Sequence, residues 1–240
     1  MDILQLLDDA RRRIDVLQHP FYQRWNAGEL TAEELAFYAG EYRHAVVALA
    51  DASELAAQRA ADSSLPDIDG PRLAEQLGRH AAEERSHVDL WDDFAAAASF
   101  AAAADAAAAD GAAAEADASS ESSVEALPQT QTCADSWTAG EELLDHLAVL
   151  YAIEGAQPAI STTKLTGLKT HYGFEEASPG LSYFKLHAEL DVEHADQAGR
   201  LLRRLASEQD SERLLFRAEA ALRGNWTLLD GVQERFAVAA

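Results

Sequence analysis

The chain has 240 residues, 48% of them hydrophobic, and a formal net charge of −23 at pH 7. This length is enough for one large domain with a sizeable core. The acidic balance argues against a nucleic-acid-binding protein, because phosphate backbones need basic patches. No uncharged apolar run of about 18 residues occurs, so no membrane span is predicted.

The cysteine and lysine content, together with the first residues of the chain, bears on the expected compartment and salt conditions. A single cysteine, Cys133, allows neither an internal disulfide nor a cysteine-based metal site. The first residues lack the apolar core of a signal peptide, so we expect a cytoplasmic protein. Acidic residues number 42 and lysines only three, which suggests a halophilic protein whose charge repulsion is screened by salt.

Three helices are predicted in the first part of the chain. Apolar residues recur at helical spacing over residues 2–18. Pro20 ends that helix, and residues 21–25 form a short aromatic connector. A Thr-x-x-Glu capping box opens a second helix over residues 31–61. A proline at the first turn then begins a third helix over residues 71–98.

The composition changes after the third helix. Residues 101–123 are nearly all Ala, Asp, Glu and Ser and include no large apolar side chain. Such a stretch cannot bury a face, although its alanines favour a solvated helical extension. We therefore predict a low-complexity acidic insertion at about 99–136 within a single domain spanning residues 1–240.

Helical patterns resume after the insertion, over residues 138–154, 160–172, 181–208 and 212–236. No segment alternates between apolar and polar residues with the period of two that marks a strand. The predicted fold class is all-α, a bundle of about seven helices.

Two of these helices carry candidate metal ligands at matching spacing. His187, Asp191 and His194 fall at i, i+4 and i+7, on one stripe of a helix. Burying two imidazoles and a carboxylate together is unfavourable unless something binds them. Nitrogen and oxygen ligands of this kind suit iron, manganese or zinc. An exposed polar face is the alternative that the spacing leaves open.

The third helix repeats this spacing with His80, Glu84 and His87. A Glu-x-x-His pair on a helix of a bundle is a recurring way to hold two iron or manganese ions. Glu154 is a different kind of candidate, because it follows a largely apolar run and so is expected to be buried. A buried carboxylate requires a cation or a proton.

Together these residues resemble the haem-oxygenase-like di-iron oxidases and oxygenases of the TenA/PqqC superfamily. The resemblance also covers the start of the chain around Leu17-Gln-His-Pro-Phe21 and the end around Trp226. It implies a haem-oxygenase-like bundle and two iron ions, or an Fe/Mn pair, bound by six side chains: Glu84, His87, Glu154, His187, Asp191 and His194. Some relatives place the carboxylate seven residues before the histidine, so His80 could replace or supplement Glu84.

The resemblance also implies an activity. The metals would activate O2 to oxidise a small organic substrate, with an external reductant and a homodimeric state both compatible with the family. Glu41, Tyr42 and Tyr151 are candidates to line the pocket, with a structural role as the alternative. The metal ions would carry out the oxidation, while the protein would set the geometry of the site and exclude water from it.

Three other functions remain to be weighed. A thiaminase or aminopyrimidine hydrolase of the same fold uses a cysteine nucleophile, but Cys133 falls within the predicted insertion. A metal-free oxidase of the PqqC type would use histidines to bind an organic substrate, and the paired carboxylates argue against it. A non-enzymatic metal-binding or regulatory bundle is the third alternative.

Overall fold

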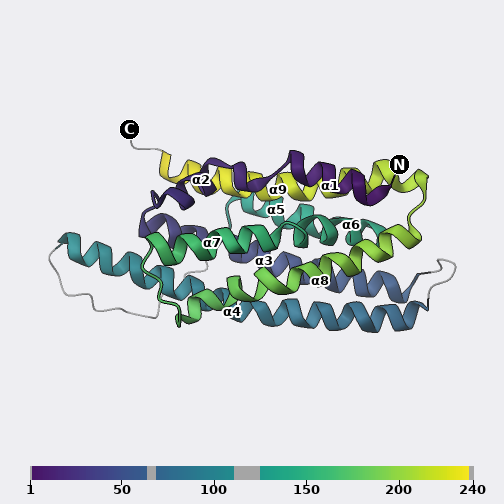
Figure 1. The fold of residues 1–240 in the computed structure, drawn as a ribbon, viewed down its shortest axis with the longest axis horizontal. Helices are drawn as coiled ribbons and strands as arrows, with labels where there is room; N and C mark the ends of the chain where they lie inside the picture. Colours follow the sequence, from purple (N-terminus) through teal and green to yellow (C-terminus); the bar gives the residue numbers. More distant parts are fainter. Residues whose placement is uncertain (1, 64–68, 111–124, 238–240) are drawn as a thin grey trace.

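The computed structural model describes residues 2–63, 69–110 and 125–237. Within these ranges every regular element is helical, which confirms the all-α fold class. Three short 3-10 helices, at 16–18, 179–181 and 208–210, accompany the α-helices. Most helices run along the long axis of the molecule (Figure 1). Their bounds are α1 Ile3–Arg13, α2 Pro20–Ala27, α3 Ala32–Ala61, α4 Gly70–Asp110, α5 Pro128–Thr138, α6 Leu143–Glu154, α7 Gln157–His171, α8 Ser182–Leu205 and α9 Ser211–Ala237.

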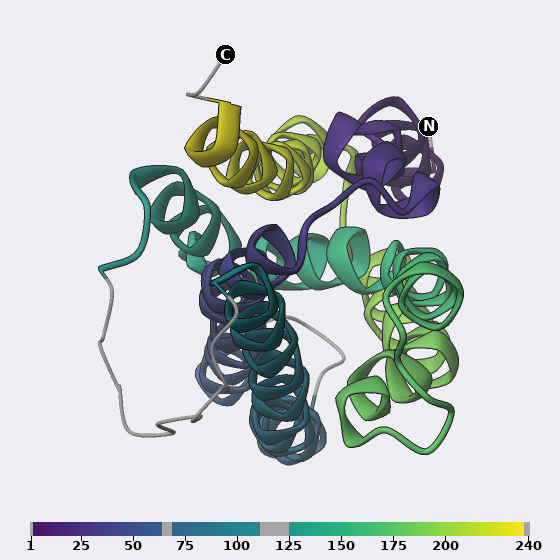
Figure 2. The same ribbon diagram turned by 90° about the vertical axis from the view of Figure 1, so that its left-hand side faces the viewer.

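The helix α6 forms the centre of the bundle. All twelve of its residues are buried, and it contacts α3, α8 and α9. The view along the bundle shows α6 surrounded by the other helices (Figure 2). A helix that is apolar on every side is stable only in such a position. Its last residue, Glu154, is thereby placed in the interior.

The long helices α3 and α4 lie side by side along one edge of the bundle (Figures 1 and 2). The predicted capping box is present, because Thr31 and Glu34 bind each other's backbone N–H groups at the start of α3. Aromatic packing joins the pair: the ring centroids of Tyr42 and Trp91 lie 5.1 Å apart. Among the described residues, no helix combines the length and hydropathy needed to cross a bilayer.

Residues 21–25 were predicted to form a connector, and this prediction is wrong. They lie within α2, whose first turn is capped by the His19 side chain accepting from the N–H of Phe21. Phe21, Tyr22 and Trp25 are buried. A histidine at the N-cap before a proline gave no recognised start signal, since Ser, Thr, Asp and Asn are the usual caps.

The far boundary of the predicted insertion is also wrong. The helix α5 lies inside the predicted range and packs against α3 and α9. Thr130 and Cys133 are buried, and the indole N–H of Trp137 donates to the carbonyl of Ala221. The low-complexity part therefore ends before residue 128. Residues 111–124, where the composition is most biased, lie outside the described ranges.

Candidate metal centre

Three helices direct seven polar side chains to one point inside the bundle. The helix α4 contributes His80, Glu84 and His87 from successive turns of one face, and the last residue of α6 contributes Glu154. The helix α8 contributes a second stripe, and all seven side chains are at most 8% exposed. The structure thus brings together the six predicted residues and His80: His80, Glu84, His87, Glu154, His187, Asp191 and His194.

Glu84 occupies the middle of this cluster. Its Oε1 lies 3.4 Å from His87 Nδ1 and 3.5 Å from His194 Nδ1. Its Oε2 lies 3.8 Å from His187 Nε2. The sequence left open whether His80 or Glu84 points into the cluster, and in the structure both side chains do. One carboxylate therefore faces imidazoles from two helices.

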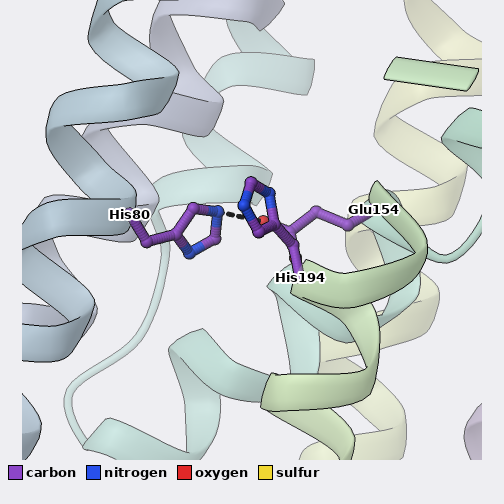
Figure 3. Close-up of side chains that lie close together, drawn as sticks. All are labelled: His80, Glu154 and His194. Atoms are coloured by element: carbon purple, nitrogen blue, oxygen red, sulfur yellow. Dashed lines mark ion pairs between the residues drawn. The ribbon is translucent and has the colours of Figure 1, made fainter. Parts of the chain in front are cut away.

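Glu154 forms a second point of contact beside Glu84. Its Oε1 lies 3.0 Å from His80 Nε2, and the ring centroids of His80 and His194 are 4.0 Å apart. Figure 3 shows these three side chains turned toward one another from α4, α6 and α8. Asp191 Oδ1 lies 3.9 Å from His194 Nδ1, so the third carboxylate joins the same cluster.

The polar atoms of this cluster lack hydrogen-bond partners within the described part of the chain. Nine ring nitrogens and carboxylate oxygens are buried without one. Each such atom destabilises the fold by about 1–3 kcal/mol unless a partner is supplied. Three overlapping groups of the cluster have ligand atoms within 4.8 Å of one another. The arrangement therefore fits bound metal ions, for which these nitrogens and oxygens are suitable donors.

The charges in the cluster shift the pKa values of its members. Burial, reinforced by the neighbouring carboxylates Glu84 and Glu154, raises the pKa of Asp191 to about 9. Burial opposes protonation of His80, but Glu154 and Glu84 outweigh it and raise the pKa of His80 to about 10. Burial likewise opposes ionisation of Glu84, yet the four surrounding imidazoles hold its pKa well below the usual value. Without metal, Asp191 and His80 therefore favour their protonated forms, and metal cations could take the place of these protons.

Backbone and side-chain contacts orient two of the histidines. His187 Nδ1 lies 2.8 Å from the carbonyl of Tyr183, and the two rings stack with centroids 3.9 Å apart. This leaves Nε2 facing the cluster. His194 turns Nδ1 inward, while its Nε2 lies 3.4 Å from the carboxylate of Glu83, a side chain that is 60% exposed. Partners of this kind fix the orientation of metal-binding imidazoles.

The three predicted pocket residues have different surroundings. Tyr42 is fully buried near the cluster, and burial raises the pKa of its hydroxyl, with the negative charge of Asp191 adding to the effect. Glu41 instead accepts hydrogen bonds from the Leu127 N–H and the Thr130 hydroxyl, and so ties α5 to α3. The hydroxyl of Tyr151 donates to Asp8 of α1 at 2.8 Å.

One buried group was missed from the sequence. Lys164 of α7 is 1% exposed, and its Nζ lies 4.2 Å from the ring centroid of Tyr42. Tyr22 and Tyr38 lie slightly farther from it. Burial lowers the pKa of Lys164 well below the usual value, so the charged form of the amine is disfavoured. Its place four residues after Ile160 was too weak a signal to predict its burial.

The fold and the cluster together define a class of protein: a haem-oxygenase-like helical bundle with an internal His/carboxylate site. Two solved structures show the same fold. A domain with a heme oxygenase-like fold from Shewanella denitrificans aligns with a TM-score of 0.74 at 19% identity, covering 98% of this chain and 94% of its own. A TenA homologue from Pseudomonas syringae gives 0.72 at 17% identity, covering 97% and 91%.

Sequence comparison identifies the family. Residues 71–226 match the sequence profile of the iron-containing redox enzymes, and the chain belongs to that family. It is 28% identical to a 4-aminobenzoate synthase of Chlamydia muridarum, over 98% of this chain and 91% of the relative. A 4-aminobenzoate synthase of Nitrosomonas europaea is 27% identical, over 97% and 91%. The matched region contains all seven residues of the cluster.

Proposed function

We propose that the cluster binds two iron ions and that the chain uses them to activate O2 and oxidise a small organic substrate. The observation that carries this proposal is the set of nine buried donor atoms without hydrogen-bond partners in the described chain. The six residues assigned as ligands are Glu84, His87, Glu154, His187, Asp191 and His194. When bound, iron supplies the electrons and open coordination positions for reducing O2, drawing on an external reductant where the reaction requires one.

The chain's own residues prepare the site for this chemistry. Glu84, Glu154 and Asp191 supply three carboxylates, which offset most of the charge of two divalent cations. Tyr183 fixes the orientation of His187 through its carbonyl and its ring. Burial of the whole cluster keeps bulk water away, and this strengthens each electrostatic interaction inside.

We infer further that the product is 4-aminobenzoate or a closely related aromatic amine. The relatives that bear that name match nearly the whole chain. The interior beside the cluster also suits aromatic chemistry, because the rings of Tyr22, Tyr38 and Tyr42 surround the buried amine of Lys164. A buried lysine with a lowered pKa can act as a nucleophile or a hydrogen-bonding group.

The structure supplies arguments against two of the alternatives. Cys133 lies in the core of the bundle and not in a polar linker. Burial raises the pKa of its thiol, so it remains protonated and is a poor nucleophile for a thiaminase reaction. A metal-free oxidase would leave the carboxylates of Glu154 and Asp191 buried without partners.

The test combines O2 consumption with product detection. Protein purified without oxygen is loaded with ferrous iron and exposed to O2 with a reductant and a protein-free cell extract as the source of substrate, and new 4-aminobenzoate is sought by mass spectrometry. We expect O2 consumption by the native chain and its loss in Asp191→Ala. The control is Asp196→Ala, an exposed carboxylate on the same helix. Equal O2 consumption by both variants would contradict the assignment of Asp191, and O2 consumption without an aromatic amine would contradict the product.

A further inference from the structure

The six proposed ligands leave His80 without a role, although it lies inside the same cluster. We propose that His80 is a seventh donor, and that the donors divide into two triads, each with two histidines and one carboxylate, with Asp191 as the remaining donor. The first triad, called the His80 triad, is His80, His194 and Glu154. The second, called the His87 triad, is His87, His187 and Glu84. This inference rests on the proposed metal-dependent function.

The contacts of His80 support a role as a metal donor. Its Nε2 lies 3.0 Å from Glu154 Oε1 but is not aligned for a hydrogen bond. His194 Nδ1 is also buried without a hydrogen-bond partner in the described chain. A simple His80–Glu154 ion pair would satisfy neither His194 nor the second oxygen of Glu154. One cation between the three side chains of Figure 3 would satisfy them all.

His80 also changes how the donors divide between two ions. Without it, the ion beside Glu154 would have one imidazole and the ion beside Glu84 would have two. With it, each ion has two imidazoles and one carboxylate, a ligand set that suits ferrous iron with open positions for O2. Asp191, Glu84 and His194 also have ligand atoms that lie within 4.8 Å of one another. These two carboxylates therefore lie where they can link the triads.

The two triads differ in how firmly their histidines are held. In the His87 triad, His187 is fixed by a buried 2.8 Å contact with the Tyr183 carbonyl. In the His80 triad, the outward nitrogen of His194 faces the exposed carboxylate of Glu83 at 3.4 Å. A less firmly oriented ligand binds metal more weakly. The His87 triad should therefore fill first and the His80 triad second.

The experiment is an anaerobic titration with Co(II), whose visible absorption reports the ligands without any need for enzymatic activity. We expect the native chain to bind two equivalents in two steps. His80→Ala should keep the first step and weaken the second at least about 10-fold. His80→Glu should restore the second step, because a carboxylate can replace the lost donor. His44→Ala, at an exposed histidine on α3, is the matched control and should behave as the native chain does.

The outcomes separate this inference from the proposed function. If His80→Ala binds two equivalents with native affinity and spectrum, His80 is not a donor, and the metal-dependent function stands. If His80→Ala binds none while its circular dichroism shows a folded bundle, the two triads are not separate sites. If the native chain binds no cobalt, the proposed function itself fails. Should His80→Ala not fold, His80→Gln removes the same donor with less change in volume and is held to the same expectations.

Discussion

The metal centre and the surroundings of Lys164 both bury ionisable side chains, but their charges are arranged differently. In the centre, four histidines and three carboxylates face each other from α4, α6 and α8, so opposite charges offset one another. The amine of Lys164 is instead enclosed by aromatic rings, with Tyr42 at 4.2 Å. Burial acts to lower the pKa of both groups. At His80 the carboxylates of Glu154 and Glu84 outweigh burial and raise the pKa to about 10, whereas at Lys164 no neighbouring charge offsets it and the pKa lies well below its usual value. The first region suits bound cations, and the second disfavours the charged form of an amine.

The largest effect expected from this comparison is at Glu84, the carboxylate shared by the imidazoles of both helices. Glu84→Ala should abolish tight metal binding, with a loss of at least about 100-fold in affinity. Isothermal titration with Mn(II) under anaerobic conditions measures this. Glu75→Ala changes an exposed carboxylate on the same helix and should leave affinity unchanged. If Glu84→Ala bound Mn(II) with native affinity, Glu84 would not be a metal ligand.

The metal-free protein should lose stability between pH 7 and pH 9. Asp191 and His80 have pKa values raised to about 9 and about 10. A raised pKa contributes stability below the unfolded value and loses it as the pH rises through the folded value. Glu84, whose pKa is lowered, contributes above its unfolded value and so adds no change in this range. The lowered pKa of Lys164 acts in the opposite direction, and it offsets part of the loss caused by the two raised groups. Bound metal replaces the protons of Asp191 and His80, so the stability of the metal-loaded protein should depend less on pH in this range.

Urea midpoints at the two pH values, with and without metal, check this prediction. Asp191→Ala removes one of the two groups and should reduce the slope of the metal-free protein. A metal-free midpoint that rises between pH 7 and pH 9 would contradict the account of the cluster's charges.

The surroundings of Lys164 predict the opposite response to a substitution. Lys164→Met should stabilise the fold by about 1–3 kcal/mol at pH 7, since the amine loses its hydration on folding and its charged form is disfavoured by burial. Because the pKa of Lys164 is lowered from 10.5, the gain should shrink as the pH approaches that value. Urea unfolding measures it. The control Lys185→Met, at an exposed lysine paired with Glu176, should change stability by less than about 1 kcal/mol. Marked destabilisation by Lys164→Met would contradict the account of Lys164 as an amine whose burial is unfavourable.

The smallest effect concerns the surface outside both regions. With a net charge of −23, the folded chain repels itself, and salt should relieve this repulsion. Raising KCl from about 0.1 M to about 1 M shortens the screening length from about 10 Å to about 3 Å. We expect the melting temperature of the metal-free protein to rise by about 2–4 °C, equivalent to about 1 kcal/mol. A melting temperature that falls with KCl would contradict the prediction of a halophilic protein.

The two regions also differ in how far the sequence predicted them. The cluster could be found because His, Glu and Asp recur at i, i+4 and i+7 on two helices, and this spacing survives folding. Glu154 could be found because a carboxylate at the end of an apolar run must be buried. Lys164 could not, because its neighbours Tyr22, Tyr42 and Trp91 come from α2, α3 and α4 and meet it only in the folded chain.

Two helices were missed for local reasons. The residues of α2 look like an aromatic connector because its cap is a histidine and its first residue a proline. The residues of α5 are mostly Gln, Thr, Ser and Asp, so only Cys133 and Trp137, four residues apart, mark its buried face. A pair of apolar positions is too short a pattern to separate a helix from the low-complexity stretch before it.

The central claim is that this cluster holds two iron ions, and diffraction from crystals loaded with ferrous iron without oxygen tests it most directly. Data collected at the iron absorption edge reveal each ion by its anomalous scattering. We predict two peaks among the side chains of His80, Glu84, His87, Glu154, His187, Asp191 and His194. No peak in this cluster, or iron bound only elsewhere on the chain, would contradict the account.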